Sequence, residues 1–183
     1  MEKEWDIVEV LRHSRHDWLN RLQLIKGNLD LNRIDRAKAV IDEIIIETQH
    51  ESKLSNLKMP LFASLLLKSN WENPSFKLEY EVLQDTQSSP INEDLLIKWT
   101  CLLFKCLNEA IEPFQENHLS ITIDSQSKGI RFFFDFSGII IKSKVIKEFL
   151  AEPTSQLDMV VKDFSESELA LEVFIPYQKN GKN

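Results

Sequence analysis

A stripe of apolar side chains runs through the first part of the chain at alternating spacings of three and four residues. It lies within residues 3 to 31, which contain no proline and a single glycine, Gly27. The members of this stripe, called the seam below, are Val8, Leu11, Trp18, Leu22, Ile25 and Leu29, with Arg15 as one basic interruption. Such spacing is typical of a helix that packs lengthwise against other helices. We therefore predict one helix over residues 3 to 31, roughly 40 Å long.

A second helix is predicted over residues 35 to 57, because Asn32 and Asp35 supply turn and capping chemistry and Pro60 follows its end. One of its faces carries Ile34, Ala37, Ile41, Ile44 and Thr48. A lone hairpin of two long helices buries only one side of each apolar stripe, so we expect two chains to pair as a four-helix bundle in a homodimer. The alternative is a monomer in which the C-terminal half packs along the hairpin.

After Pro60 the pattern changes to shorter helices and strands. The expected helices are residues 61–71, 93–114 and 142–150, and the expected strands are residues 76–82, 118–124, 130–136, 157–164 and 169–177. This mixture predicts an α+β fold, in which helices cover one face of a mostly antiparallel sheet. We therefore divide the chain into a helical hairpin, residues 1–59, and an α/β sandwich domain, residues 60–183.

Composition excludes several classes of function. The 183-residue chain has a formal net charge of -7 and no dense basic patch, which argues against binding to nucleic acid. The N-terminus lacks the pattern of a signal peptide, and the longest apolar run, residues 61–67, is too short to cross a bilayer. We therefore expect a cytoplasmic protein with no membrane partner. Cys101 and Cys106 are expected to be buried thiols rather than a redox pair.

Four residues share one face of the first helix, away from the seam. At 100° per residue from Leu22, we place Gln23, His16, Gly27 and Asn20 at about 100°, 120°, 140° and 160°. Histidine supplies a nucleophile, the two amides supply hydrogen-bonding groups, and glycine lets another protein approach the backbone closely. Spacing alone does not distinguish such a stripe from ordinary surface residues.

The residues around His16 form a longer string with a known counterpart. Residues 13–29 read His-Ser-Arg-His-Asp-Trp-Leu-Asn-Arg-Leu-Gln-Leu-Ile-Lys-Gly-Asn-Leu. This string resembles the phosphoacceptor helix of the sporulation initiation phosphotransferase B family, and the related helical domain of citrate- and malate-type sensor kinases carries a similar Arg-His-Asp-x-x-Asn core. Residues 50–58, His-Glu-Ser-Lys-Leu-Ser-Asn-Leu-Lys, resemble the end of the family's second helix. The resemblance covers about residues 11 to 58.

The resemblance implies a dimeric histidine phosphotransferase with a phosphohistidine intermediate and no ATP hydrolysis. Such an enzyme takes a phosphoryl group from the aspartyl phosphate of one response regulator and passes it to the aspartate of a second. In a sporulation phosphorelay, these partners are a single-domain intermediate regulator and a sporulation transcription factor. We assign His16 as the catalytic phosphoacceptor in preference to His13, because Asp17 adjoins His16 and Asn20 lies one turn further on.

The neighbours of His16 are given supporting and docking roles. Asp17 would orient the ring or accept its second proton, although it could instead pair with Arg21 one turn on. Asn20 and Gln23 would hydrogen-bond the phosphoryl oxygens or a loop of the partner.

Gly27 and Arg15 are expected to contact the partner protein. Arg15 lies in the seam and could instead pair with a carboxylate across the bundle or reach the phosphoryl group. Trp18 is expected to be a core residue. We expect this chain to bind no cofactor or metal ion, because the receiver domain of the partner would supply Mg²⁺.

The resemblance further implies a C-terminal domain with the fold of a histidine-kinase ATPase domain. Those domains hold Mg-ATP through an Asn-rich helix motif and two glycine boxes. Aligning Glu109-Ala110 with the family's Asn-Ala puts Lys105 and Glu109 at the Mg-binding positions. Residues 135–139, Asp-Phe-Ser-Gly-Ile, have one glycine, which is out of step with the first box, and nothing resembles the second. The domain is therefore expected to be a degenerate relative that does not bind ATP. An active histidine autokinase and a non-enzymatic helical dimer that docks receiver domains remain the alternatives.

The purified protein is expected not to bind Mg-ATP, because it lacks the bare backbone amides that approach a triphosphate. Calorimetry with millimolar Mg-ATP should show no saturable heat. A micromolar binding isotherm would instead support the autokinase.

Overall fold

The computed structural model describes residues 5–72, 75–83, 90–152 and 157–178. Its internal contacts form two compact units, residues 1–49 and 50–183. The first unit contains helix α1 (Ile7–Asp30) and most of helix α2 (Ile34–Asn56). Helix α1 begins after Asp6, whose carboxylate accepts a hydrogen bond from the backbone N–H of Glu9 at 2.8 Å. Both predicted helices are confirmed, and residues 3 and 4 of the first prediction lie outside the described residues.

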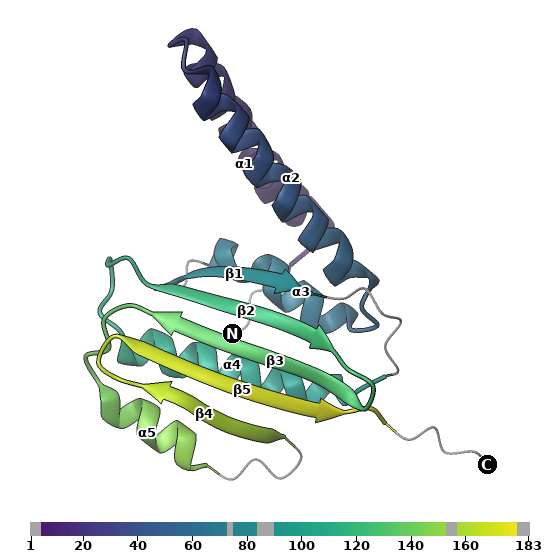
Figure 1. Ribbon diagram of the computed structural model, residues 1–183, viewed down its shortest axis with the longest axis vertical. Helices are drawn as coiled ribbons and strands as arrows, with labels where there is room; N and C mark the ends of the chain where they lie inside the picture. Colours follow the sequence, from purple (N-terminus) through teal and green to yellow (C-terminus); the bar gives the residue numbers. More distant parts are fainter. Residues whose placement is uncertain (1–4, 73–74, 84–89, 153–156, 179–183) are drawn as a thin grey trace, which may run out of the picture. The chain divides into compact units, whose positions relative to one another are not determined.

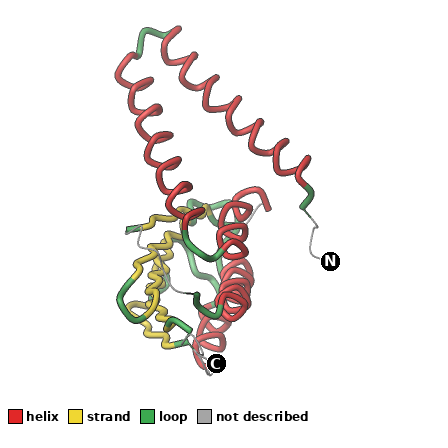
Figure 2. Tube along the Cα trace, turned by 90° about the vertical axis from the view of Figure 1, so that its right-hand side faces the viewer, coloured by secondary structure: helices red, strands yellow, loops and turns green. Residues whose placement is uncertain are grey.

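The hairpin buries little of its own apolar surface. Asn32 turns the chain with a φ of 55°, and Figure 2 shows the two helices moving apart with distance from this turn. Helix α1 has no buried residue, and in the described part of this unit only Ala37 is buried. The exposed members of the seam are Val8, Leu11, Trp18, Leu22 and Leu29. Trp18 is 48% exposed in one chain, so the core position expected for it would require a second chain.

The second unit is built on a five-stranded sheet (Figure 1). Its strands are β1 (Lys77–Val82), β2 (His118–Ser125), β3 (Gly129–Ser137), β4 (Asp158–Phe164) and β5 (Glu168–Pro176). They lie in the order β1-β2-β3-β5-β4, and all neighbours are antiparallel except β1 and β2. The parallel pair arises because a long helix connects these two strands. The expected, mostly antiparallel sheet is confirmed.

Three helices cover one face of this sheet, as Figures 1 and 2 show. They are α3 (Pro60–Ser69), followed by the short 3-10 helix η1 (Asn70–Glu72), α4 (Glu93–Ala110) and α5 (Ser143–Ala151). The core lies between the two layers, where Phe132 packs on Phe62 and Phe134 packs on Trp99 with ring centroids 5.5 and 5.0 Å apart. The α+β class predicted from the sequence is confirmed.

Helix α4 ends at Ala110, four residues before the predicted end. Ile111 is extended, with φ -96° and ψ 159°, and bridges to Ile140. Pro113 causes this early end, because proline disfavours helical geometry in the residue before it and cannot continue the hydrogen-bond ladder.

Of the two thiols on α4 that were expected to be buried, only one is. Cys106 is buried, but Cys101 is exposed. Five residues correspond to about 140° around a helix, so the two side chains leave α4 in different directions.

The last two turns of α2 belong to the core of the second unit. Leu54 and Leu57 are buried there. His50 accepts a hydrogen bond on Nδ1 from the backbone N–H of Val82 at 3.3 Å, and Lys53 donates to the Val82 carbonyl at 3.1 Å. The end of α2 is thus held by β1, as well as by apolar packing.

The buried side chain of Asn117 fixes the loops around β2 and β3. Its amide nitrogen donates to the carbonyl oxygens of Ser75 and Glu112 at 3.0 and 2.8 Å, and its oxygen accepts from the backbone N–H of Ile139 at 3.0 Å. One side chain thereby satisfies three backbone groups from three separate segments of the chain.

Asn117→Ala is expected to lower the free energy of unfolding of the second unit by about 2–4 kcal/mol, because it leaves partly buried backbone groups without partners. Urea unfolding followed by circular dichroism measures the change. Asn108→Ala is the matched control, since exposed Asn108 accepts one hydrogen bond, from the Ser75 N–H at 2.8 Å. Equal losses in the two variants would contradict the role given to Asn117.

Candidate functional site

The residues predicted to form the site lie on one exposed face of α1. His16, Asn20, Gln23 and Gly27 are all exposed, and the side chain of His16 is 73% accessible to solvent. These residues lie between one and three turns apart on a continuous helix, so α1 alone sets their spacing. The site therefore does not depend on any contact with the sheet.

Two neighbours on the same helix approach one nitrogen of the His16 ring. The Asn20 amide nitrogen lies 3.2 Å from His16 Nδ1, and Asp17 Oδ1 lies 3.6 Å from the same atom. Among the described residues, none forms a hydrogen bond with His16 Nε2. The ring is thus held through Nδ1, while its other nitrogen is open to an incoming reactant.

His13, the other histidine of the string, has a different environment. Its ring packs against Trp5 with centroids 5.0 Å apart, and the residue is half-buried. Its neighbours are therefore those of a packed side chain rather than those of a surface nucleophile.

The two residues expected to dock a partner have free space around them. A Cβ atom built on Gly27 would meet no atom within 4 Å, so packing within this chain does not require glycine there. Arg15 is exposed and forms no ion pair with the residues described by the structure.

Sequence reasoning missed the ion pair that links the two helices. Arg21 of α1 pairs with Glu47 of α2, although Arg21 was considered as the partner of Asp17. The signal was absent from the sequence, because the register of two helices across a turn decides which charges meet. Asp17 lies beside His16, as its supporting role requires.

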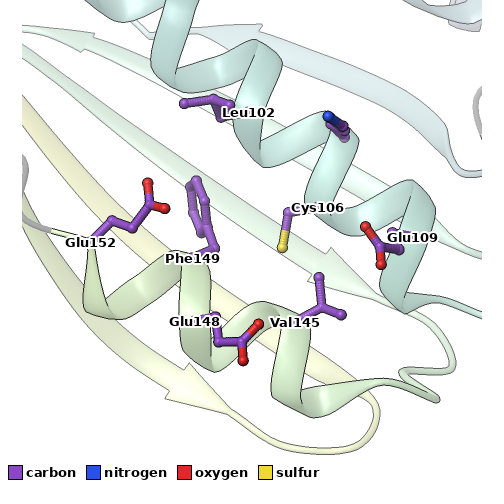
Figure 3. A pocket seen from close by; sticks show the side chains of 8 residues that line it. Leu102, Cys106, Glu109, Val145, Glu148, Phe149 and Glu152 are labelled. Carbon is purple, nitrogen blue, oxygen red and sulfur yellow. The ribbon is translucent and has the colours of Figure 1, made fainter.

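The positions compared with the Mg-binding amides of kinases lie in the second unit. Lys105 and Glu109 both border a hollow between α4 and α5 (Figure 3). Gly138, the lone glycine of the candidate box, has a packing role, because a Cβ atom there would lie 2.2 Å from Asn117 Oδ1. Throughout the described ranges, no group of three or more His, Cys, Asp or Glu side chains is arranged to hold a metal ion. None of the described helices has the length and apolar character needed to cross a bilayer.

Comparison with protein families gives two adjoining matches that cover most of the chain. Residues 1–57 match the alpha-helical domain of the Spo0B-type sensor kinases, and residues 58–176 match the C-terminal domain of sporulation initiation phosphotransferase B. The sporulation initiation phosphotransferase B of Bacillus subtilis (strain 168) is 34% identical over 170 residues, which are 92% of this chain and 88% of that protein.

Two solved structures are also matched at low identity. The histidine kinase AdeS of Acinetobacter baumannii has a TM-score of 0.46 and 8% identity, covering 90% of this chain and 98% of that one. A bacterial phosphotransferase has a TM-score of 0.40 and 12% identity, covering 93% of this chain and 98% of that one.

A hairpin that bears an exposed histidine, followed by a sheet domain with these matches, defines a phosphotransferase. The chain belongs to the sporulation initiation phosphotransferase B family. The family and the type of enzyme predicted from the string around His16 are thereby confirmed.

Proposed function

We propose that His16 accepts a phosphoryl group from the aspartyl phosphate of one response-regulator receiver domain and passes it to the aspartate of a second. The observation that carries this proposal is the exposed imidazole, with Asp17 and Asn20 at Nδ1 and with Nε2 open. The name of the Bacillus subtilis relative, a phosphotransferase of sporulation initiation, supports the same reaction. By analogy, the two partners would be a single-domain intermediate regulator and a sporulation transcription factor, in the cytoplasm.

The chemistry requires one proton to stay in place while the phosphoryl group moves. The reaction needs the ring proton on Nδ1, where the Asp17 carboxylate lies 3.6 Å away and where the Asn20 amide, turned to present its oxygen, would accept that proton in a hydrogen bond. The lone pair of Nε2 then attacks the phosphorus of the aspartyl phosphate in line. The new N–P bond forms as the P–O bond to the aspartate breaks, and the electron pair of that bond leaves with the carboxylate. The ring becomes a positively charged phosphoimidazolium, which the negative charge of Asp17 stabilises.

The second transfer reverses these bonds. A carboxylate oxygen of the second receiver domain attacks the phosphorus, the N–P bond breaks, and its electron pair returns to Nε2. Asn20 carries both a hydrogen-bond donor and an acceptor, so its amide serves the ring in either tautomer. Gln23 lies further along the face, where it would hydrogen-bond the partner.

The helix surface offers little charge to stabilise the transferring group, whose negative charge spreads over three oxygens. We therefore assign that task to the Mg²⁺ and basic side chains of the receiver domain, and to this chain the positioning of the nucleophile. Gly27 allows close approach of the partner's backbone, and Arg15 adds a positive charge to the docking surface. The C-terminal domain takes no part through ATP, because Lys105 and Glu109 replace the amides that would hold Mg²⁺.

His16→Gln is expected to abolish labelling by a phosphorylated receiver domain, because the nucleophile is removed while the exposed helix surface stays intact. The measurement is acid-labile phosphate on the protein after incubation, with circular dichroism to check the helix content. His13→Gln is the matched control and should keep the label. Loss of labelling in His13→Gln, together with normal labelling in His16→Gln, would refute the assignment.

The same proposal includes a homodimer, because the seam needs a cover. Its apolar side chains lie on the side of α1 that faces away from His16, and the hairpin alone leaves them exposed. Pairing two hairpins as a four-helix bundle would bury both stripes and leave the His16 face free for a receiver domain.

Leu22→Glu is expected to dissociate or unfold the bundle, because it places a charge from each chain in the proposed core, where an unpaired charge is strongly destabilising. Phosphotransfer should fall with it. Light scattering measures the mass. Leu24→Glu is the matched control, since Leu22 and Leu24 are 56% and 55% exposed in one chain but Leu24 lies outside the seam. A monomeric wild-type protein, or a dimeric and active Leu22→Glu variant, would contradict the bundle.

A further inference from the structure

One more charged side chain lies on the face of α1 that carries His16. Arg12 precedes His16 by four residues, which places it about 6 Å away along the helix axis and about 40° around it. Arg12 is exposed, as His16 is, and it forms no ion pair with the described residues. The two side chains are therefore neighbours on one open surface, and the positive charge of Arg12 is available to a group that arrives there.

The other charged residues next to His16 lie further around the helix. Arg15 is about 100° from His16 on the side of the seam, which the proposed bundle would cover. Asp17 is about 100° from His16 on the opposite side, where its carboxylate lies 3.6 Å from His16 Nδ1. About 140° thus separates Asp17 from Arg12, so this carboxylate does not neutralise the guanidinium group. Arg12 is the better placed of the two arginines to reach His16.

The direction of the side chains brings the His16 ring toward Arg12. Side chains on an α-helix lean toward its N-terminus, and Asn20 shows this direction, because its amide nitrogen reaches back one turn to lie 3.2 Å from His16 Nδ1. By the same geometry, His16 leans toward the turn that carries Arg12. The long side chain of Arg12 has four rotatable bonds, and helix pairs four residues apart interact in either order.

A guanidinium group suits the ligand that His16 would carry. With Asp17 and Asn20 at Nδ1, the phosphoryl group would be attached at Nε2. A bound phosphoryl group has about two negative charges at neutral pH, spread over three oxygens. The planar guanidinium binds two such oxygens at once and stays charged at every pH of interest. Arg12 therefore has both the charge and the shape for this group.

We propose that Arg12 binds the phosphoryl oxygens while the group moves between the aspartate of a receiver domain and His16, which makes Arg12 a catalytic residue of the transfer. This inference rests on the proposed function. Arg12 forms no covalent bond and keeps its proton. The N–P bond at Nε2 forms as the P–O bond to the aspartate breaks, and Arg12 stabilises the negative charge on the three oxygens during this exchange. The receiver domain remains the main source of positive charge.

The test is single-turnover transfer to the full-length protein from the single-domain regulator of the proposed relay, phosphorylated on its aspartate with acetyl phosphate. Arg12→Gln should lower the maximal rate constant about three- to thirtyfold, because it removes one exposed, charged contact to the transferring group. The receiver concentration that gives half the maximal rate should change less than about twofold, since the contact is strongest in the transition state. Arg12→Lys should recover part of the loss, because lysine keeps the charge without the planar fork.

Arg36→Gln is the matched control. Arg36 is also an exposed arginine without an ion pair among the described residues, and it lies at the start of α2, about four helical turns from His16 along the hairpin. This variant should transfer at the wild-type rate. A wild-type rate in Arg12→Gln, or an equal loss in both variants, would overturn the role of Arg12. A higher half-saturating concentration with an unchanged maximal rate would also overturn it, because Arg12 would then only dock the partner.

Mapping the phosphate in the wild-type protein separates this inference from the proposed function. Phosphate on His16 together with a wild-type rate in Arg12→Gln would refute the role of Arg12 alone. Phosphate on another residue, or none, would refute both, because Arg12 would then have no phosphoryl group beside it. Circular dichroism and light scattering check that each variant keeps the helix content and the mass of the wild type.

Discussion

The apolar stripe on α1 imposes the main constraint on this molecule. The hairpin lacks enough residues to cover the stripe, and its two helices separate beyond the turn, so Leu11, Trp18 and Leu22 remain exposed in one chain. Covering an apolar surface of this extent with another chain is favourable, because it removes the surface from water. The faces of the helix that are not covered must then be polar. His16 and its neighbours occupy that polar remainder. In our proposal, assembly and reactivity use different faces of one helix, so a partner would reach one face while the other is covered.

This division explains why so few residues are needed for the reaction. A helix holds side chains one turn apart at a fixed spacing, so Asp17 and Asn20 reach His16 Nδ1 without help from a second element. Under the proposed function, this arrangement orients a nucleophile but supplies little positive charge. In our proposal the receiver domain supplies that charge, which makes the transfer dependent on the correct partner. Specificity then comes from docking on the exposed face rather than from an enclosed pocket.

The second unit has a different physical basis. Its stability comes from aromatic and aliphatic side chains between the helices and the sheet, and from Asn117, which joins three segments of backbone. In our proposal, Lys105 and Glu109 stand where kinase domains have their Mg-binding amides, so this domain would not hold a magnesium nucleotide.

Periodicity in the sequence determined the two long helices, the α+β class and the exposed face of His16, because these depend on the spacing of residues close together in the chain. Tertiary structure decided what periodicity does not contain. The pairing of Arg21 with Glu47 depends on helix register, the exposure of Cys101 depends on which side of α4 meets the core, and the parallel pairing of β1 and β2 depends on the path of α4. Local pattern fixes which side of an element is apolar, whereas contacts between distant segments exist only after the chain has packed.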